Sequence, residues 1–262
     1  MKVKLWEPVK IKRDKEYHWR IGGVWIWCAR TDEEWMLAWE HEEAEEAETE
    51  VATTRIPKPE HLTWERYVAD EKTEVLQLVP ALQDRAVVVS SDITLKILPG
   101  SKALFFVGIP VWVRVHIGAR KDTELAEIPT RILSNTWFGD PTTGELCYSL
   151  QSRAGRDIGH IPASPHKAIC PVRLVNSSAG KLDFQKLNIH VEHLRVFAGK
   201  TRLWTNEVSI RFFGEDQPGQ VDFPSKVPQF EKPLTLLTEE RVPVSQSILK
   251  KSIGILRHFK NF

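Results

Sequence analysis

The residues of this chain that could carry out chemistry are few and widely spaced. His190 and His193 flank a glutamate in the segment His-Val-Glu-His, and imidazole and carboxylate groups are common zinc ligands. On a strand, however, side chains three positions apart point to opposite faces, so the two histidines converge only if a bulge turns one of them. No cysteine or further carboxylate completes a recognisable ligand set. We therefore expect no metal ion and no other cofactor.

Cys147 is the candidate nucleophile, with His160 or His166 as a candidate base. A single cysteine in a β-like segment is more often a small buried apolar residue. The sequence contains no Gly-x-Ser-x-Gly segment, no phosphate-binding loop and no His-Glu-x-x-His motif, which are the sequence patterns of common catalytic sites. We expect no catalytic residues, and an unrecognised hydrolase that uses scattered histidine and aspartate side chains remains an alternative.

The segment 129–148 is the best candidate for ligand binding. Residues 139–144, Gly-Asp-Pro-Thr-Thr-Gly, have the composition of a tight turn between two strands. Aromatic platforms and a carboxylate near this turn would suit a ligand such as a carbohydrate. The interpretation that we favour instead places Trp137 and Phe138 in the core beneath a rigid hairpin. The candidate ligand-binding residues are Trp137, Asp140, Tyr148 and Trp204.

Composition excludes several broad classes. The 262 residues include 36 basic and 35 acidic side chains, for a net charge of +1, so no global attraction to nucleic acid is expected. Three widely spaced cysteines argue against a disulfide framework. The first residues lack the apolar core of a signal peptide, and the longest apolar run, 103–113, is shorter than the about 20 residues of a membrane span. We expect a cytoplasmic protein.

The elements that must position these residues are mostly strands. Short β-like segments follow one another about every ten residues, separated by Gly, Pro, Asp and Ser, which favours a sandwich or barrel over alternating strands and helices. In one of them, Val113, Val115 and Ile117 alternate with Trp112 and Arg114, which predicts one buried face and one partly solvated face. The clearest strand candidates are 74–80, 86–90, 93–98, 103–110 and 111–118.

Two segments predict helices. Thr31 and Glu34 form a capping-box pattern, and aromatic residues follow at helical spacing, so a helix is expected to start at Thr31. It leads into the acidic block 40–50, which we interpret as a solvated insertion rather than a contact surface. At the other end of the chain, apolar residues of 246–262 fall on one side of a short basic amphipathic helix.

The fold class expected is therefore mainly β. We predict two β-sandwich-like domains, 1–122 with an acidic insertion near 31–53 and 123–245, followed by the C-terminal helix 246–262. One extended sandwich is the alternative. The tail helix either docks on the body by its apolar face or contacts a partner or a membrane surface. The basic residues proposed for such a contact are Lys250, Lys251, Arg257 and Lys260.

Three segments resemble a known family. They are Leu133-Ser-x-Thr-Trp-Phe-Gly-Asp-Pro-x-x-Gly-Glu-Leu-Cys-Tyr-Ser149, Cys170-Pro-Val-Arg-Leu-Val-Asn176 and Leu203-Trp-Thr-Asn206. In this order they are similar to the domain of unknown function family numbered 432. The resemblance covers the latter half of the chain well and the first 70 residues poorly. It implies a shared fold without known catalysis, and it associates the family with genes of small mechanosensitive channels.

The expected function is accordingly that of a non-enzymatic interaction or regulatory protein, associated with a membrane channel partner. No nucleic-acid partner is expected. A peripheral contact at the inner membrane through the C-terminal helix would fit this function. The alternatives are a carbohydrate-binding β domain and the hydrolase named above.

Overall fold

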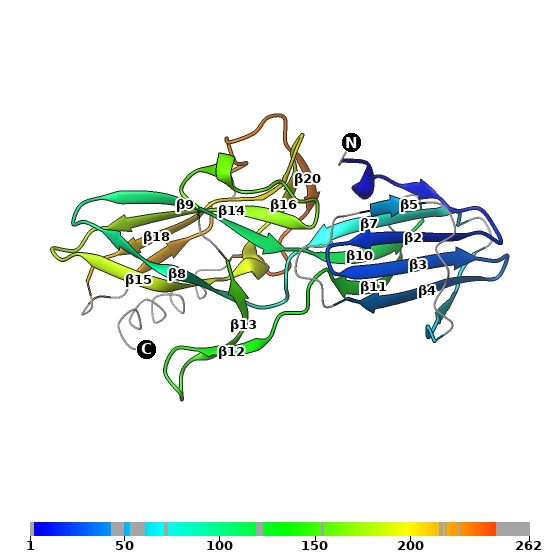
Figure 1. Cartoon of the computed structure of the whole chain (residues 1–262), viewed down its shortest axis with the longest axis horizontal. Coiled ribbons are helices and arrows are strands. Elements are labelled where there is room, and N and C mark those ends of the chain that lie inside the picture. Colours follow the sequence, from blue (N-terminus) through cyan, green and yellow to red (C-terminus); the bar gives the residue numbers. More distant parts are fainter. Residues whose placement is uncertain are drawn as a thin grey trace. The chain divides into compact units, whose positions relative to one another are not determined.

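The computed structural model shows a mainly β chain (Figure 1), which confirms the expected fold class. The residues that it describes are 3–42, 50–52, 61–70, 73–118, 123–152, 155–214, 217, 219–224 and 226–244. The chain forms two compact units built from interleaved segments. The first unit comprises Met1–Ala81, Pro110–Ile132 and Ser164–His166, and the second comprises Leu82–Ile109, Leu133–Ala163 and Lys167–Phe262. The position at which we expected a continuous chain to divide, 122/123, lies inside the first unit.

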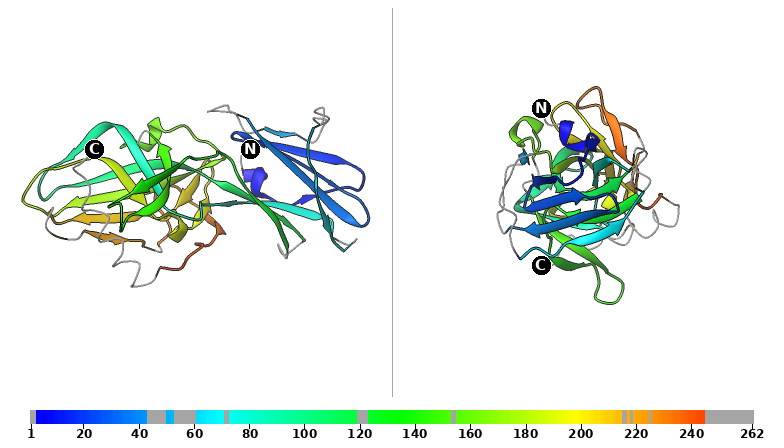
Figure 2. Two further views of the ribbon diagram at one scale, coloured as in Figure 1. Left: turned by 90° about the horizontal axis from the view of Figure 1, so that it is seen from below. Right: turned by 90° about the vertical axis from the view of Figure 1, so that its right-hand side faces the viewer.

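The first unit consists of two antiparallel sheets. One has the strand order β1-β7-β10-β11 and the other β5-β2-β3-β4-β6. In Figure 2 the blue strands of the second sheet and the cyan and green strands of the first form two layers. The elements are η1 (Val3–Trp6), β1 (Val9–Lys10), β2 (Glu16–Ile21), β3 (Val24–Arg30), β4 (Glu34–His41), β5 (Glu50–Ala52), β6 (Glu65–Val68), β7 (Val75–Ala81), β10 (Trp112–Ile117) and β11 (Thr123–Pro129).

Strand β10 shows how the sequence builds this layer. Its burial alternates as predicted, with Val113, Val115 and Ile117 buried and the residues between them partly exposed. β-Branched side chains on one face of a strand pack well against an opposing sheet. Because β10 lies between β7 and β11 in the strand order, its backbone is paired on both sides and its apolar face forms part of the core.

The helix expected to start at Thr31 is wrong. Residues Glu34–His41 form β4, which pairs antiparallel with β3. The Thr31 hydroxyl does cap local amides, because it accepts hydrogen bonds from the Glu33 and Glu34 amides at 3.3 Å, but here it stabilises the β3–β4 turn. Trp35 and Leu37, two positions apart, are both buried. Pairing with β3 therefore overrides a local pattern that also suits a helix.

The second unit also contains two sheets. Their strand orders are β12-β13-β8-β15 and β19-β18-β14-β17-β16-β20, with β9 paired to β14. The elements are β8 (Val87–Ile97), β9 (Lys102–Pro110), β12 (Asn135–Phe138), β13 (Glu145–Gln151), η2 (Ile158–His160), β14 (Lys167–Asn176), β15 (Leu182–Ile189), η3 (Val191–His193), β16 (Val196–Ala198), β17 (Leu203–Thr205), β18 (Val208–Phe212), β19 (Gln220–Asp222) and β20 (Thr235–Thr238).

Strand β8 is the central element for the sites described below. It pairs in parallel with β13 and antiparallel with β15. We use the name motif hairpin for β12, the turn 139–144 and β13, and the name histidine turn for residues 190–193, which follow β15. The strand order therefore places the motif hairpin on one side of β8 and the strand that leads into the histidine turn on the other.

Two sequence predictions fall on residues outside the described ranges. Most of the acidic block lies there, because residues 43–49 are not described, and so does the expected C-terminal helix 246–262. At the near edge of the block, Glu42 accepts hydrogen bonds from Arg20 at 2.6 Å and from the Trp25 indole at 2.5 Å. Within the described part of the chain, no helix is both long enough and apolar enough to cross a membrane.

Candidate functional site

The turn of the motif hairpin is held by its own polar groups. Asp140 Oδ1 accepts hydrogen bonds from the Thr142 amide at 2.8 Å and the Thr142 hydroxyl at 2.5 Å. The Asp140 carbonyl accepts from the Gly144 amide at 2.7 Å and from the Trp137 indole Nε1 at 3.1 Å. A Cβ at position 144 would lie 2.5 Å from that Nε1, so only glycine allows this close approach. The turn therefore fixes the orientation of the Trp137 ring.

The two aromatic residues of β12 point in different directions. Phe138 is buried and packs with Ala86, Val88 and Cys147, as we expected. Trp137 is 52% exposed, so the favoured prediction that it lies in the core is wrong. Its cross-strand partner is Leu146, which is 47% exposed. Adjacent residues of a strand face opposite sides, and the side that carries Trp137 and Leu146 faces solvent.

The base of the hairpin is anchored at Tyr148. Its hydroxyl donates to Asp84 Oδ1 at 3.0 Å, and the guanidinium of Arg85 lies 4.8 Å from the ring centroid. Burial and the Asp84 carboxylate raise the pKa of Tyr148, so the phenol remains a neutral donor at physiological pH. Tyr148 therefore has a clear role in fixing the hairpin.

Trp204 occupies a different environment from the other three ligand-binding candidates. It lies in β17 and is only 2% exposed. Its indole Nε1 donates to Glu231 at 2.7 Å, and its ring stacks on Phe230 with the centroids 5.7 Å apart. Phe106 meets the ring edge-on at 6.4 Å. Trp137, Asp140 and Tyr148 belong to the motif hairpin, whereas Trp204 forms part of the core of the other sheet.

The asparagines of the two shorter family segments have structural partners. Asn176 donates to the Ile97 carbonyl at 3.0 Å and to the Gly180 carbonyl at 2.8 Å. Asn206 accepts from the Arg195 amide at 2.8 Å and donates to the Pro224 carbonyl at 3.2 Å. A buried amide side chain that bonds to backbone groups on separate segments fixes those segments together. The two asparagines therefore have structural roles, since each joins separate backbone segments by hydrogen bonds.

The histidine turn is where the structure departs most from the strand geometry assumed above. β15 ends at Ile189, and Val191–His193 form a 3-10 turn instead of continuing the strand. Val191 and Leu194 are buried and hold the turn against the core. The His190 and His193 rings consequently stack with centroids 6.1 Å apart and an interplanar angle of 23°. The argument that these rings lie on opposite faces is wrong, because the segment is not a strand.

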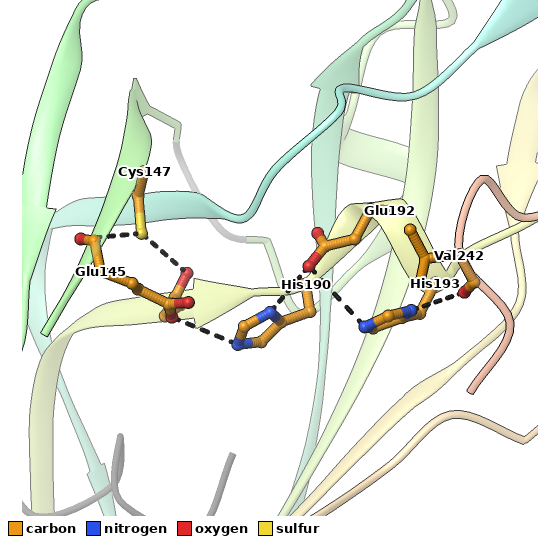
Figure 3. Close-up of polar contacts among 7 residues, drawn as sticks. Glu145, Cys147, His190, Glu192, His193 and Val242 are labelled. Carbon is orange, nitrogen blue, oxygen red and sulfur yellow. Dashed lines mark hydrogen bonds and ion pairs between the residues drawn. The ribbon is translucent and has the colours of Figure 1, made fainter. Parts of the chain in front are cut away.

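Glu192 lies between the two imidazole rings (Figure 3). Its Oε1 is 2.9 Å from His190 Nδ1 and 3.7 Å from His193 Nε2. Beyond His190, Nε2 lies 3.3 Å from Glu145 Oε1, and beyond His193, Nδ1 lies 2.6 Å from the Val242 carbonyl oxygen. Burial lowers the pKa of His190, but the contacts with Glu145 and Glu192 outweigh it and raise the pKa to about 9.

The sequence contains one pattern that points to this cluster. The alternation of apolar residues changes phase between Val191 and Leu194, which marks the place where the strand must break. A turn at that position brings residues three apart onto the same side. The contributions of Glu145 and Val242 have no such local pattern, because they come from distant parts of the chain.

Cys147 does not have the environment of a nucleophile. It is fully buried, and its thiol lies 3.9 Å from Asn188 Oδ1. Burial, together with the nearby carboxylates of Glu145 and Glu192, raises its pKa to about 12. A reactive cysteine needs a lowered pKa and solvent access. Of its two candidate bases, His166 belongs to the first unit and contacts the Ser164 hydroxyl at 2.9 Å.

The basic residues proposed for a partner or membrane contact lie outside the described ranges, and their role stays a prediction. They are Lys250, Lys251, Arg257 and Lys260.

Comparison with known proteins gives one result. No curated protein and no solved structure matches the chain. A family match covers residues 5–257, which includes the first 70 residues that the sequence segments alone cover poorly. The chain therefore belongs to the family described as protein of unknown function (DUF432).

Proposed function

We propose that this protein acts without catalysis, as a regulatory protein that binds a protein partner through the motif hairpin. The observation that carries the proposal is the exposed pair of Trp137 and Leu146. Large apolar side chains that stay exposed side by side have no role in the core, and aromatic residues contribute much of the binding free energy at protein interfaces.

The hairpin is organised before a partner arrives. The indole NH of Trp137 is bonded to Asp140 and the turn is closed by the Gly144 amide, so the ring does not need to be ordered on binding. Ordering side chains and loops on binding costs conformational entropy, which reduces affinity. A ring already held in place by its own turn keeps that cost small, which supports a recognition role.

Strand β12 offers a second means of binding. It is the last strand in the order β12-β13-β8-β15, so within the described part of the chain one side of its backbone has no neighbouring strand. An extended segment of a partner can add to such an edge through main-chain hydrogen bonds, with side-chain contacts supplying specificity. Trp137 and Leu146 lie next to this edge and would supply the apolar contacts.

As the partner we propose a membrane channel of the small mechanosensitive class. The support for this choice is the gene association that family membership implies, together with the basic composition of the tail 246–262. The tail would place the protein at the inner face of the membrane, beside the channel. Electrostatic attraction of lysine and arginine to anionic lipid supports such a location.

The test measures binding of the purified protein to vesicles that contain the channel and to empty vesicles of the same lipid. The double variant Trp137→Ala with Leu146→Ala should lose channel-dependent binding. Leu98→Ala is the matched control, because Leu98 is 63% exposed in the same unit but lies outside the hairpin. Equal binding of the double variant and the wild type would refute the hairpin as the contact surface.

A truncated chain that ends at residue 245 separates the two parts of the proposal. Loss of binding to both kinds of vesicle would assign the membrane contact to the tail. Retained binding to channel vesicles would assign the partner contact to the body of the protein. If the truncated protein is folded and binds both kinds of vesicle as well as the full chain does, the tail has no part in localisation.

A carbohydrate platform is the alternative use of the exposed Trp137 ring. Such a site needs polar acceptors around the ring, and the nearest candidate, Asp140, already accepts two hydrogen bonds from Thr142 through Oδ1. Saccharide-dependent quenching of tryptophan fluorescence that disappears in Trp137→Ala would favour this alternative over a protein partner.

A further inference from the structure

The histidine turn brings three potential ligand atoms into a small volume. One atom from each of His190, Glu192 and His193 lies within 4.8 Å of the others. Bonds of about 2.0–2.2 Å to a tetrahedral zinc ion require ligand atoms about 3.3 Å apart. The contacts of Glu192 Oε1, 2.9 Å to one ring and 3.7 Å to the other, are close to that separation on either side. The ligand atoms of the two rings lie within 4.8 Å of each other, so the side chains would have to adjust to bring all three ligand atoms to that separation.

The partner of His193 selects the tautomer that a metal needs. A carbonyl oxygen can only accept, so His193 Nδ1, 2.6 Å from the Val242 oxygen, carries a proton. In the neutral ring the lone pair is then on Nε2, the nitrogen that faces Glu192. A metal-binding histidine commonly donates its other ring NH to a backbone carbonyl or a carboxylate, which fixes the ring and its tautomer.

His190 lies between two carboxylates. Its Nδ1 is 2.9 Å from Glu192 Oε1, and its Nε2 is 3.3 Å from Glu145 Oε1. A carboxylate only accepts, so Nδ1 donates its proton to Glu192 in the metal-free protein, and a bound cation would displace that proton while Nε2 keeps its proton toward Glu145. Glu145 is itself held by the Asn188 amide at 2.6 Å. Both rings thus have an oxygen acceptor on the side away from Glu192 (Figure 3).

The cluster is also enclosed. The side chains of His190, Glu192 and His193 are 11%, 13% and 4% exposed. Among the described residues, no hydrogen-bond partner reaches Glu192 Oε2, although that oxygen is shielded from solvent. A buried carboxylate oxygen without a partner is costly, and coordination to a cation would satisfy it.

We propose that His190, Glu192 and His193 bind one divalent zinc-like metal ion, with Glu145 and the Val242 carbonyl positioning the two imidazole rings. Two imidazoles and one carboxylate suit zinc, cobalt or nickel, whereas magnesium and calcium prefer ligand sets made only of oxygen. The three ligands lie in the second unit on the histidine turn, whereas Glu145 belongs to β13 of the motif hairpin, on the face opposite to Leu146.

The test titrates zinc chloride into the full chain without an affinity tag, after treatment with a chelator, and follows the heat of binding. One ion per chain is expected. Glu192→Gln and His193→Gln keep the size of each side chain, and each should lose more affinity than Glu145→Gln. The positioning variant Glu145→Gln should lose about 10- to 100-fold. Excess magnesium should not displace the bound zinc.

His61→Ala is the matched control, because His61 also contacts a glutamate, Glu40, at 3.0 Å but on an exposed surface. It should bind zinc as the wild type does. The wild type loaded with Co²⁺ should show the visible absorption of a tetrahedral site, a readout that does not depend on the folding of any variant. Absence of zinc binding in the wild type, or undiminished binding in Glu192→Gln or His193→Gln, would overturn the proposal.

Discussion

The motif hairpin and the histidine turn depart in opposite ways from the usual distribution of side chains. The hairpin exposes large apolar groups, Trp137 and Leu146, whereas the turn buries polar ones, His190, Glu192 and His193. Both segments flank the same central strand, β8, in the sheet order. Exposed apolar patches and buried ionisable groups are informative because neither is favourable for folding alone.

The two regions would be stabilised by different kinds of binding. Removing an apolar surface from water lowers the free energy of a complex, and a surface that is already rigid loses little entropy on binding. A buried cluster of imidazole and carboxylate groups is stabilised when a cation coordinates it and neutralises the carboxylate charge. We therefore propose macromolecular recognition by the hairpin and ion binding by the turn, and each proposal predicts a different response to mutation.

The largest effect is expected when a tryptophan of the core is removed. Trp204→Ala deletes a side chain that is 2% exposed and packed against Phe106 and Phe230. Its cost should be about 3–5 kcal/mol in the free energy of unfolding, measured with urea. Trp137→Ala removes an exposed ring and one hydrogen bond to the Asp140 carbonyl, so it should cost only about 0.5–1.5 kcal/mol. Equal losses in the two variants would remove the distinction between the hairpin and the core.

The next largest effect is expected at Glu192. In metal-free protein, Glu192→Ala removes the nearer of the two carboxylates that contact the His190 ring and should cost about 1.5–3 kcal/mol, the usual contribution of a hydrogen bond to a charged group. Glu239→Ala is the control, because Glu239 also contacts a cation, Arg195, at 2.8 Å but is 61% exposed. A solvated ion pair of that kind contributes about 1 kcal/mol or less.

The cost of Glu192→Ala should also depend on pH. Contacts with two carboxylates raise the pKa of His190 from 6.5 to about 9 in the folded protein. The stabilisation is therefore fully present below pH 6.5 and is lost as the pH rises through about 9. The difference in unfolding free energy between the wild type and Glu192→Ala should shrink over that window. A difference that stays constant would mean that His190 is not charged in the folded protein.

A somewhat smaller effect is expected at the hairpin turn. Gly144→Ala would place a Cβ 2.6 Å from the Phe138 carbonyl and 2.5 Å from the Trp137 indole nitrogen. Overpacking of this kind costs about 1–3 kcal/mol. Gly180→Ala is the control, since a Cβ there meets nothing within 4 Å. If urea unfolding finds both variants equally stable, the turn is not the rigid support that we describe.

Local patterns predicted much of the fold. Alternation identified β10, and the strand candidate 103–110 corresponds to β9. The candidates 86–90 and 93–98 together correspond to one strand, β8. These elements are determined by the period-two pattern of apolar residues and by turn composition, which are properties of short stretches of sequence.

The failures come from strand pairing, between neighbouring strands in one case and between distant segments in the others. Residues Glu34–His41 suit a helix locally, but pairing with β3 makes them a strand. The parallel pairs of β8 with β13 and of β14 with β18 join segments far apart in the sequence. Glu145 reaches His190 for the same reason. Contacts between distant segments produce no periodic pattern in a single sequence. The cluster of the histidine turn with Glu145 therefore could not be predicted as a whole.

Trp137 provides the most direct test of the comparison. All ten tryptophans lie in the described ranges, and among them only Trp137 is one of the exposed large hydrophobic residues, whereas Trp204 is buried. Quenching of tryptophan fluorescence by acrylamide should be measured for the wild type, Trp137→Phe and Trp204→Phe. Loss of the most accessible emission in Trp137→Phe alone is the predicted result. Unchanged quenching in Trp137→Phe, or the same loss in Trp204→Phe, would contradict the exposed surface on which the proposed function rests.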